Sequence, residues 1–217
     1  MKNDSQKESL WRALKLYAVT DRAWLRGRTL PSQVEQAILG GATMVQLREK
    51  DLPPDEFLAE ARIIKEITQK YNVPLIINDN IEVALACGAD GVHVGQSDTS
   101  AAEARRQIKP DTLLGVSVDT PEQAVIAQRC GADYLGAGAV FPTGTKLDAD
   151  YVPPAALSSI CAAVTIPVVA IGGIHAGNLG ELAGTGIAGI AVVSALFAAE
   201  DVRAAAEELC RLTGGLW

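Results

Sequence analysis

The feature that most constrains the fold is an eightfold alternation of short β-branched segments with longer helical patterns. The expected strands cover residues 16–20, 44–49, 74–79, 91–95, 113–118, 134–140, 167–173 and 190–196. Helical patterns follow them at residues 31–41, 54–71, 81–89, 100–108, 120–132, 154–164, 178–186 and 200–212. Eight βα units without a linker-like stretch predict an α/β protein, a TIM (β/α)₈ barrel that forms a single domain over residues 1–217. Residues 1–15 are expected to form a short N-terminal helical extension. An open doubly wound sheet is the alternative, and the missing GxGxxG after the first strand disfavours it.

The composition suits buried parallel strands and excludes several kinds of partner. Apolar residues make up 48% of the chain and aromatic residues 5%, as expected for β-branched strands covered by helices. A formal net charge of −7 argues against a nucleic acid or a membrane as the partner, because both call for a basic surface. An acidic protein can still bind phosphorylated small molecules, and these are the expected partners.

The cysteines and the N-terminal segment indicate a reducing compartment. Four cysteines lie far apart and form no CxxC pair: Cys87, Cys130, Cys161 and Cys210. We therefore expect reduced, mostly buried thiols rather than disulfides or a zinc site. No apolar run reaches the roughly 18 residues of a membrane span, and Asp4 and Glu8 fit poorly with a transit peptide. The expected location is the cytoplasm. The sequence is compatible with a homo-oligomer but does not set its order.

In a (β/α)₈ barrel the chemistry lies at the C-terminal ends of the strands, and the second strand ends in an unusual polar run. Alternation places Gln46, Arg48 and Lys50 on one face, with Leu47 and Glu49 on the other. Gln46 and Arg48 inside a barrel need a polar ligand to compensate for their desolvation, which favours an anion site. The alternative is a surface ion pair between Glu49 and Lys50.

Acidic residues follow the third and fourth strands. Asp79 and Asp98 are expected on adjacent strand ends, which lie about 4.8 Å apart in a sheet, so they could share one hard cation. Two carboxylates combined with waters and substrate phosphates are typical ligands of Mg²⁺. The alternative is that these residues only cap the following helices, since a helical pattern begins at Ile81 and both Asp79 and Asn80 precede it.

A histidine and a serine lie in the fourth and fifth strands without the signature of a nucleophilic triad. His93, on an apolar strand, is expected to be a hydrogen-bonded core residue. Ser117 has no GxSxG elbow around it, and the chain contains only two histidines. The residue types therefore predict binding roles here rather than acyl transfer.

Small residues follow the last two strands. Gly172 and Gly173 come after the seventh strand, and Val193 and Ser194 after the eighth. Glycines and a helix start at these positions match the phosphate site that many barrels carry, in which backbone N–H groups bind the anion. A tight turn without a ligand is the alternative for the glycine pair.

The stretch VFPTGTK, residues 140–146, follows the sixth strand. It lacks the GxxxxGK[ST] spacing of a P-loop, so on its own it indicates an ordinary polar turn. In the barrel it falls between the predicted metal site and the glycine turn. Thr143, Thr145 and Lys146 then lie on the rim, where Lys146 could join Arg48 and Lys50 in one anion site, with Gly144 letting the backbone fold inward.

Seven motifs in this order resemble those of the thiamine phosphate synthase family: VQLREK, IIND, ADGVHVGQSD, LGVS, FPTGTK, AIGGI and VVSAL. The resemblance covers essentially the whole chain from Leu16 onward. It implies a transferase of thiamine biosynthesis, in which hydroxymethylpyrimidine pyrophosphate loses pyrophosphate and a thiazole phosphate nitrogen attacks the pyrimidine methylene. If pyrophosphate leaves early, negative charge develops on its oxygens in the transition state. Cations and hydrogen-bond donors already in place would stabilise that charge.

The resemblance also implies roles for individual residues. The implied site for the pyrimidine pyrophosphate consists of Gln46, Arg48, Lys50, Asn78, Ser117 and Lys146. The implied site for the thiazole phosphate consists of Thr143, Thr145, Gly173, Val193 and Ser194. Asp79 and Asp98 would hold Mg²⁺, the implied cofactor, and the implied catalytic residues are Lys146, Arg48 and Ser117.

Three positions depart from the family pattern, and two other functions remain alternatives. Asp119 stands where a histidine is usual, Asn80 where Arg or Asp is usual, and Gly138-Ala139 where Gly-Pro is common. An extra carboxylate at Asp119 would be unfavourable near pyrophosphate unless it faces away or a cation compensates for it. A related thiazole tautomerase would not need the full metal and pyrophosphate set. A non-enzymatic sensor of a phosphorylated thiamine precursor has little need of a metal pair.

Overall fold

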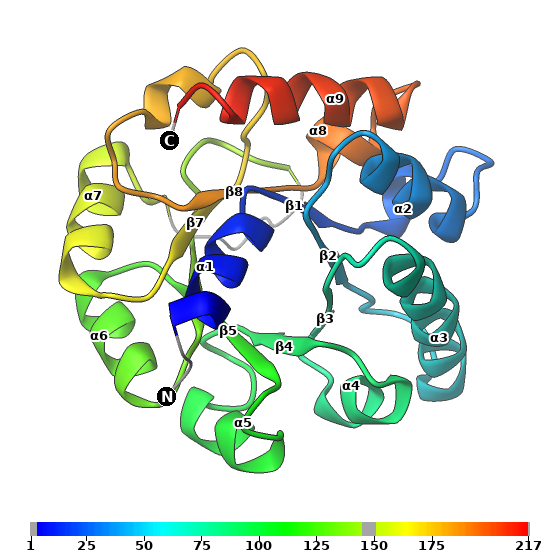
Figure 1. Cartoon of the computed structure of the whole chain (residues 1–217), viewed down its shortest axis with the longest axis horizontal. Helices are drawn as coiled ribbons and strands as arrows, with labels where there is room; N and C mark the ends of the chain where they lie inside the picture. The colour runs from blue at the N-terminus through cyan, green and yellow to red at the C-terminus, as the bar shows by residue number, and fades with distance from the viewer. Residues whose placement is uncertain (1–3, 145–150, 217) are drawn as a thin grey trace.

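The computed structural model describes residues 4–144 and 151–216, and these form a closed barrel of eight parallel strands in sequential order (Figure 1). The strands are β1 (Leu16–Val19), β2 (Met44–Leu47), β3 (Leu75–Asn78), β4 (Gly91–Val94), β5 (Leu113–Val118), β6 (Tyr134–Ala137), β7 (Val168–Ile171) and β8 (Gly189–Val192). The predicted TIM barrel is confirmed. Four strands (β2, β6, β7 and β8) end two to four residues earlier than expected, because the chain leaves the sheet there and turns onto the rim.

Helices follow the strands and form the outer ring of the barrel (Figure 1). They are α2 (Leu30–Leu39), α3 (Pro54–Lys70), α4 (Ile81–Cys87), α5 (Ala101–Gln107), α6 (Pro121–Arg129), α7 (Pro154–Ala163), α8 (Ser194–Phe197) and α9 (Val202–Thr213). The described residues also contain two 3₁₀ turns, η1 (Arg22–Trp24) and η2 (Leu179–Leu182). The helix expected over 178–186 is wrong. Gly184 and Gly186 have φ of 77° and 88°, which a right-handed helix does not allow, so only η2 forms.

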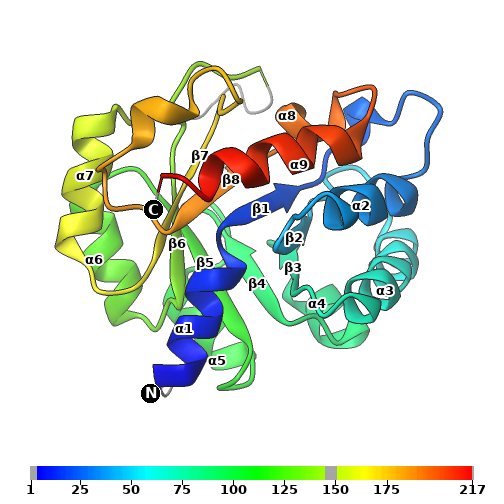
Figure 2. The ribbon, with the colours of Figure 1, turned by 45° about the horizontal axis from the view of Figure 1, so that its top comes forward.

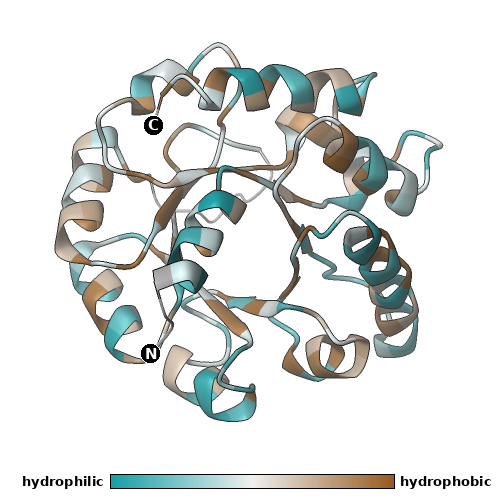
Figure 3. Cartoon of the chain, in the orientation of Figure 1, coloured by the Kyte–Doolittle hydropathy of each residue, from teal (hydrophilic) through white to brown (hydrophobic). Residues whose placement is uncertain are grey.

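Alternation along each strand separates two apolar layers. In Figure 3 the surrounding helices carry hydrophobic residues as well as hydrophilic ones. Tyr17 and Met44 are paired in register and belong to the cluster inside the barrel. Their neighbours Ala18 and Val45 belong to the larger cluster between the barrel and its helices. This period of two fixes which residues at a strand end can reach the barrel interior.

One end of the barrel is covered by the N-terminal helix α1 (Asp4–Ala13), which lies over the centre of the strand ring in Figure 1. Leu10 and Leu14 are buried in the inner cluster, next to the start of β8. Gly189 has no room for a side chain, because a Cβ there would lie 1.9 Å from the Leu14 carbonyl oxygen. The N-terminal end is therefore filled by apolar contacts, and the opposite end carries the cavity.

The last helix closes the ring against the first one after β1. Figure 2 shows α9 running across β8 and β1 beside α2. A Cβ at Gly40, which ends α2, would lie 2.4 Å from the Arg203 carbonyl oxygen and 2.6 Å from Ala206 Cβ. Because α9 lies this close to the end of α2, only glycine fits at position 40, where the turn after α2 begins.

Cysteine burial is lower than the sequence suggested. All four thiols are free, as expected, but three of them are half-buried and Cys210 is exposed. The expectation of mostly buried thiols is wrong, because these residues sit at helix ends and on the outer faces of helices. In the part of the chain that the structure describes, no helix is long and apolar enough to cross a bilayer.

Candidate active site

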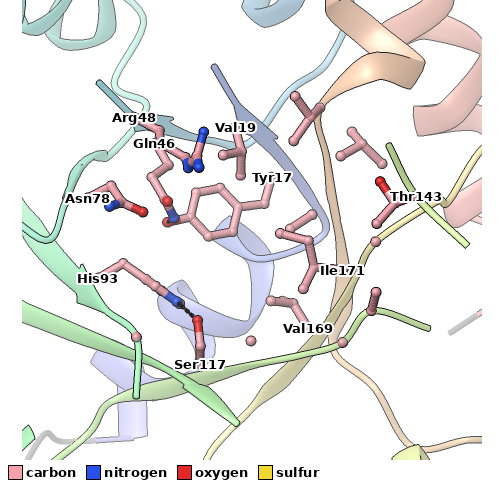
Figure 4. A pocket seen from close by; sticks show the side chains of 18 of the residues that line it. Tyr17, Val19, Gln46, Arg48, Asn78, His93, Ser117, Thr143, Val169 and Ile171 are labelled. Atoms are coloured by element: carbon pink, nitrogen blue, oxygen red, sulfur yellow. Dashed lines mark hydrogen bonds between the residues drawn. The ribbon is translucent and has the colours of Figure 1, made fainter. Parts of the chain in front are cut away.

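A cavity of about 450 Å³ opens at the C-terminal ends of the strands (Figure 4). Every strand contributes to its wall, from Tyr17 and Val19 on β1 to Ala191 and Val192 on β8. The volume lies within the range typical of small-molecule sites. The cavity is therefore at the end of the barrel where these folds carry their chemistry.

Most of the predicted site residues line this cavity. Those that do are Gln46, Arg48, Lys50, Asn78, Asp98, Ser117, Thr143, Gly173, Val193 and Ser194. Thr145 and Lys146 lie outside the described residues. Asp79 is not part of the lining, but its carboxylate forms an ion pair with Lys50, which is.

The second strand presents its two faces as alternation predicts. Gln46, Arg48 and Lys50 point into the cavity, and the Arg48 backbone N–H donates to Thr20 Oγ1 at 3.0 Å. Glu49 faces outward, where Arg22 Nε donates to its Oε2 at 2.8 Å. The alternative pairing of Glu49 with Lys50 is wrong, because Glu49 pairs with Arg22 and Lys50 pairs with Asp79.

Glu49 sits in an unusual environment behind the cavity wall. Its side chain is 3% exposed, and Arg22 bridges it to Glu60. Burial raises the pKa of Glu49 to about 7, although Arg22 acts in the opposite direction. Glu49 Oε1 is buried without a hydrogen-bond partner among the described residues. The cluster ties η1 to the end of β2 and to α3.

The two predicted metal-binding carboxylates do not cap helices. Asn80 caps α4, accepting from the Val83 N–H at 2.9 Å, and Ser100 caps α5. Asp98 instead accepts the Gly95 N–H at 2.7 Å through Oδ2. The capping alternative is therefore wrong for both acidic residues.

Asp79 has φ of +50°, in the left-handed region that few non-glycine residues adopt. Such backbone strain concentrates at functional sites. No group of three or more His, Cys, Asp or Glu residues in the described part could hold a metal. Any cation here would depend on two carboxylates and on oxygens from a ligand or water.

Five side chains form one hydrogen-bonded chain through the barrel interior. Gln46 Nε2 donates to the Tyr17 hydroxyl at 2.8 Å, and the Tyr17 and Tyr134 hydroxyls lie 2.8 Å apart. The Tyr134 hydroxyl is 3.1 Å from His93 Nδ1, and His93 Nε2 is 3.0 Å from Ser117 Oγ (Figure 4). His93 is buried and hydrogen-bonded, as expected. Ser117 and His93 are in contact, but Tyr134 occupies the position at Nδ1 that a carboxylate holds in a triad.

The glycines after β7 form a turn that supports the loop following β6. Gly172 and Gly173 have φ of 99° and 65°. The N–H of Phe141 donates to the Gly172 carbonyl at 3.1 Å, and a Cβ at Gly173 would lie 2.5 Å from the Pro142 carbonyl oxygen. Nearby, α8 begins at Ser194, and the first N–H groups of a helix have no acceptor within it. Thr143 therefore lies in a loop held directly against the glycine turn.

Comparison with known proteins now decides the family. The model of the thiamine monophosphate synthase family matches residues 16–196. The chain belongs to this family. A thiamine-phosphate synthase of Clostridium tetani is 54% identical over 194 residues, which cover 89% of this chain and 93% of that protein. A thiamine-phosphate synthase of Ruminiclostridium cellulolyticum is 54% identical over 197 residues, covering 91% and 94%.

A solved thiamine phosphate pyrophosphorylase from Pyrococcus furiosus has the same architecture. It superposes with a TM-score of 0.89 at 42% identity, over 95% of this chain and 98% of that one. Membership in the thiamine monophosphate synthase family makes the chain a transferase of thiamine biosynthesis. The resemblance read from the seven motifs is confirmed.

Sequence reasoning missed part of the cavity wall. Tyr17, Thr20 and Gln96 line it, and Gln96 Nε2 donates to the Ser117 carbonyl at 2.6 Å. Tyr17 carried a signal, since it occupies an inward position of β1, but a tyrosine in an apolar strand is ordinarily a core residue. Asp119 also lines the cavity, and its backbone N–H donates to Gln123 Oε1 at 2.7 Å. This departure from the family pattern therefore lies in the cavity wall.

Proposed function

We propose that this protein joins hydroxymethylpyrimidine pyrophosphate to hydroxyethylthiazole phosphate, giving thiamine phosphate and pyrophosphate. The observation that supports this function is that one cavity is lined by two regions of different chemistry, each of which could bind an anion. Arg48 and Lys50 bring side-chain charge, whereas Gly173 and Ser194 bring backbone N–H groups. In Figure 4, Arg48 and Thr143 lie on opposite sides of the pocket. A pyrophosphate and a monophosphate would each find a suitable region.

The reaction is a substitution at the pyrimidine methylene carbon. The bond from this carbon to the pyrophosphate oxygen breaks, and its electron pair leaves with pyrophosphate. The lone pair of the thiazole nitrogen forms the new carbon–nitrogen bond, so no proton is transferred. The Arg48 guanidinium can bind two phosphate oxygens at once, and Lys50 adds a compact charge. Both interactions strengthen as charge builds on the leaving group, which lowers the barrier.

Asp79 and Asp98 suit a hard cation that completes its shell with substrate oxygens and water. Neither carboxylate is used as a helix cap, and Asp79 already holds a cation, the Lys50 ammonium. When bound, Mg²⁺ would neutralise negative charge on the pyrophosphate oxygens. Asp79 would then release Lys50, whose ammonium could turn to the phosphates.

The thiazole phosphate is assigned to the region around Gly173 and Ser194. Thr143 lies in the loop that the glycine turn supports, and its hydroxyl can bind a phosphate oxygen from that position. Thr145 and Lys146 follow in the same loop, and their roles are proposed from the family motif. Bringing both substrates into one enclosed site would itself supply a large part of the rate enhancement.

A dissociative course needs no protein nucleophile or strong base, and the cavity is consistent with this. His93 is engaged by Tyr134 and Ser117, and none of the four cysteines is among the lining residues. The electron-rich aminopyrimidine would stabilise the cation left after pyrophosphate departs. A pyrimidine with an electron-withdrawing 2-substituent should therefore react slower by orders of magnitude.

The test is to incubate the purified protein with both substrates and Mg²⁺, and to measure thiamine phosphate and pyrophosphate. Equal amounts of both products are expected. Arg48→Gln should lose at least about 100-fold in kcat/KM, in line with the loss of a bidentate phosphate contact. Arg62→Gln, at an exposed position of α3, is the matched control and should keep full activity.

Two outcomes would overturn the proposal. Binding of the thiazole phosphate without any pyrophosphate release, under every metal condition, would favour a carrier or sensor. Conversion of a thiazole phosphate isomer in the absence of the pyrimidine substrate would favour the tautomerase alternative.

A further inference from the structure

We propose that residues 20–29, hereafter the β1–α2 segment, hold both substrate regions of the cavity in place through two arginines. Arg22 is a positioning residue for the region assigned to pyrophosphate, and Arg28 is a positioning residue for the region assigned to the thiazole phosphate. Neither arginine is among the residues that line the cavity, so each acts through another group. The inference rests on the proposed function and concerns how that same site is held.

The charged residues after β2 need anchors outside the sheet. Arg48 and Lys50 lie beyond Leu47, the residue at which the pairing of β2 with β3 ends. Thr20, the first residue of the β1–α2 segment, is fully buried and accepts the Arg48 N–H at 3.0 Å. The ion pair between Lys50 and Asp79 is the contact that opens when the cation binds in the proposed function. Another anchor must therefore hold these residues during the reaction.

Glu49 supplies this anchor, because it stands between Arg48 and Lys50 and its side chain faces away from the cavity. The side chain is 3% exposed, and Arg22 Nε donates to Oε2 at 2.8 Å. Arg22 also pairs with Glu60 on α3, which fixes the guanidinium from the other side. Oε1 of Glu49 has no hydrogen-bond partner among the described residues, so Arg22 compensates for this buried carboxylate. Without Arg22, the carboxylate is driven toward solvent and the two cavity residues beside it shift.

The thiazole phosphate region depends on a helix that is too short to be stable by itself. The helix α8 covers only Ser194–Phe197, and Ser194 lines the cavity. A single turn fixes several residues for very few hydrogen bonds, so it forms only where other contacts support it. The Ala198 N–H donates to the Ser194 carbonyl at 3.1 Å and closes the turn. A group that binds the C-terminal end of α8 therefore also holds Ser194.

Arg28 binds this C-terminal end. Its Nη1 donates to the Ala199 and Glu200 carbonyls, at 3.0 Å each. Its Nη2 donates to the Phe197 carbonyl at 3.2 Å, and Gln33 Nε2 adds a longer contact to the same carbonyl at 3.4 Å. A helix leaves such carbonyls unpaired at its C-terminal end, where a positive charge is also favourable. Figure 1 shows α8 beside α2, the helix that the β1–α2 segment leads into.

The two arginines belong to one short segment but hold different regions, so their loss should have crossed effects. Removing Arg22 should weaken binding of the pyrimidine pyrophosphate, and removing Arg28 should weaken binding of the thiazole phosphate. A general loss of stability would not give this pattern. It would lower the amount of active enzyme and leave the KM of both substrates unchanged.

The test measures KM for each substrate, with the other substrate saturating, in wild type and in arginine variants. Arg22→Gln should raise KM for the pyrimidine pyrophosphate at least about tenfold and change KM for the thiazole phosphate less than about twofold. Arg28→Gln should do the reverse. The matched control is Arg26→Gln in the same segment, which should leave both values as in wild type. The Arg26 side chain is exposed and lies over the Trp24 ring, 5.7 Å from its centroid.

Amide hydrogen exchange, followed by NMR without any substrate, reports on the two anchors separately. In Arg22→Gln the Arg48 N–H should exchange at least about tenfold faster than in wild type, while the Ala198 N–H keeps its rate. In Arg28→Gln the Ala198 N–H should be the faster one and the Arg48 N–H should be unchanged. Arg28→Lys keeps one charged donor for the carbonyls and should show the same pattern to a smaller extent. It replaces Arg28→Gln if that variant does not fold.

Two results would overturn the inference. One is an equal change of both KM values in a folded Arg22 or Arg28 variant, and the other is wild-type exchange of both amides in these variants. Failure of wild type to make thiamine phosphate would instead count against the proposed function. The exchange rates would then still show whether the β1–α2 segment holds the two regions.

Discussion

The Lys50 ammonium forms an ion pair with the Asp79 carboxylate, so a residue assigned to pyrophosphate and a residue assigned to the cation lie in direct contact. The two come from adjacent strand ends, after β2 and β3. In the proposed function, the Lys50 ammonium neutralises the Asp79 carboxylate until the substrate and Mg²⁺ bind. Lys50 and the cation then compete for the same carboxylate.

Replacing Lys50 by Gln should therefore change the metal requirement as well as the rate. Asp79 would lose its counter-charge and should bind the cation more tightly, so the Mg²⁺ concentration at half-maximal activity should fall several-fold. The maximal rate should drop about tenfold or more, because one positive charge on the leaving group is lost. Activity measured across a Mg²⁺ titration in both proteins gives the two numbers. An unchanged half-maximal concentration would mean that the ion pair does not compete with the metal.

Glu49 should make stability depend on pH in a window near neutrality. Its pKa is about 7 in the folded protein against an ordinary value of 4.5, mainly because of burial. The folded state therefore binds the proton more tightly than the unfolded state. The resulting stability is fully present below pH 4.5 and is lost as the pH rises through 7.

The variant Glu49→Gln removes this titration. Its free energy of unfolding, measured relative to wild type by urea denaturation, should improve by about 1–3 kcal/mol between pH 5 and pH 8. Glu122→Gln, at an exposed position of α6, should follow the wild-type pH dependence. A constant difference between Glu49→Gln and wild type over this range would show that Arg22 outweighs burial.

Gly173→Ala should weaken binding of the thiazole phosphate. Gly173 has φ of +65°, and an added Cβ would lie 2.5 Å from the Pro142 carbonyl oxygen, so the loop carrying Thr143 must shift. We expect KM for the thiazole phosphate to rise at least about tenfold, while KM for the pyrimidine pyrophosphate changes little. Steady-state kinetics with each substrate varied in turn separates the two.

The matched control is Gly180→Ala in η2, where an added Cβ would meet nothing within 4 Å. It should leave both KM values as in wild type. Equal effects of Gly173→Ala on the two substrates would place this turn outside the thiazole phosphate site.

Much of the fold could be predicted because each strand and helix carries a local signal. The period of two of β2, continued past its last residue, correctly predicted that Arg48 and Lys50 line the cavity and that Glu49 does not. The helix expected over 178–186 does not form for a local reason as well, since Gly184 and Gly186 adopt positive φ. Backbone freedom at glycine outweighed periodicity there.

The chain of five hydrogen-bonded side chains in the barrel interior could not be predicted from local patterns. Tyr17 and Tyr134 are separated by 117 positions, and each resembles an ordinary apolar core residue in its strand. Their hydroxyls meet only because the closed barrel brings the inward faces of β1 and β6 together across its interior. The pairing of Arg22 with Glu49 has the same origin, since it depends on how η1 folds back over the end of β2.

Lys146 follows Thr143 and Thr145 in the sequence after β6 and lies outside the described residues. The flanks of this loop are firmly held, with the Val140 N–H donating to the Ile171 carbonyl at 3.0 Å and the Val152 N–H to the Ala139 carbonyl at 2.8 Å. Lys146→Ala should therefore leave the barrel intact while removing a cation proposed to bind the leaving group. Turnover should fall by about 10²–10³, with the melting temperature unchanged. Lys109→Ala, at an exposed position beyond α5, should match wild type in both measurements. Wild-type turnover in Lys146→Ala would exclude this lysine from the reaction and leave Arg48 and Lys50 as the charges that the pyrophosphate meets.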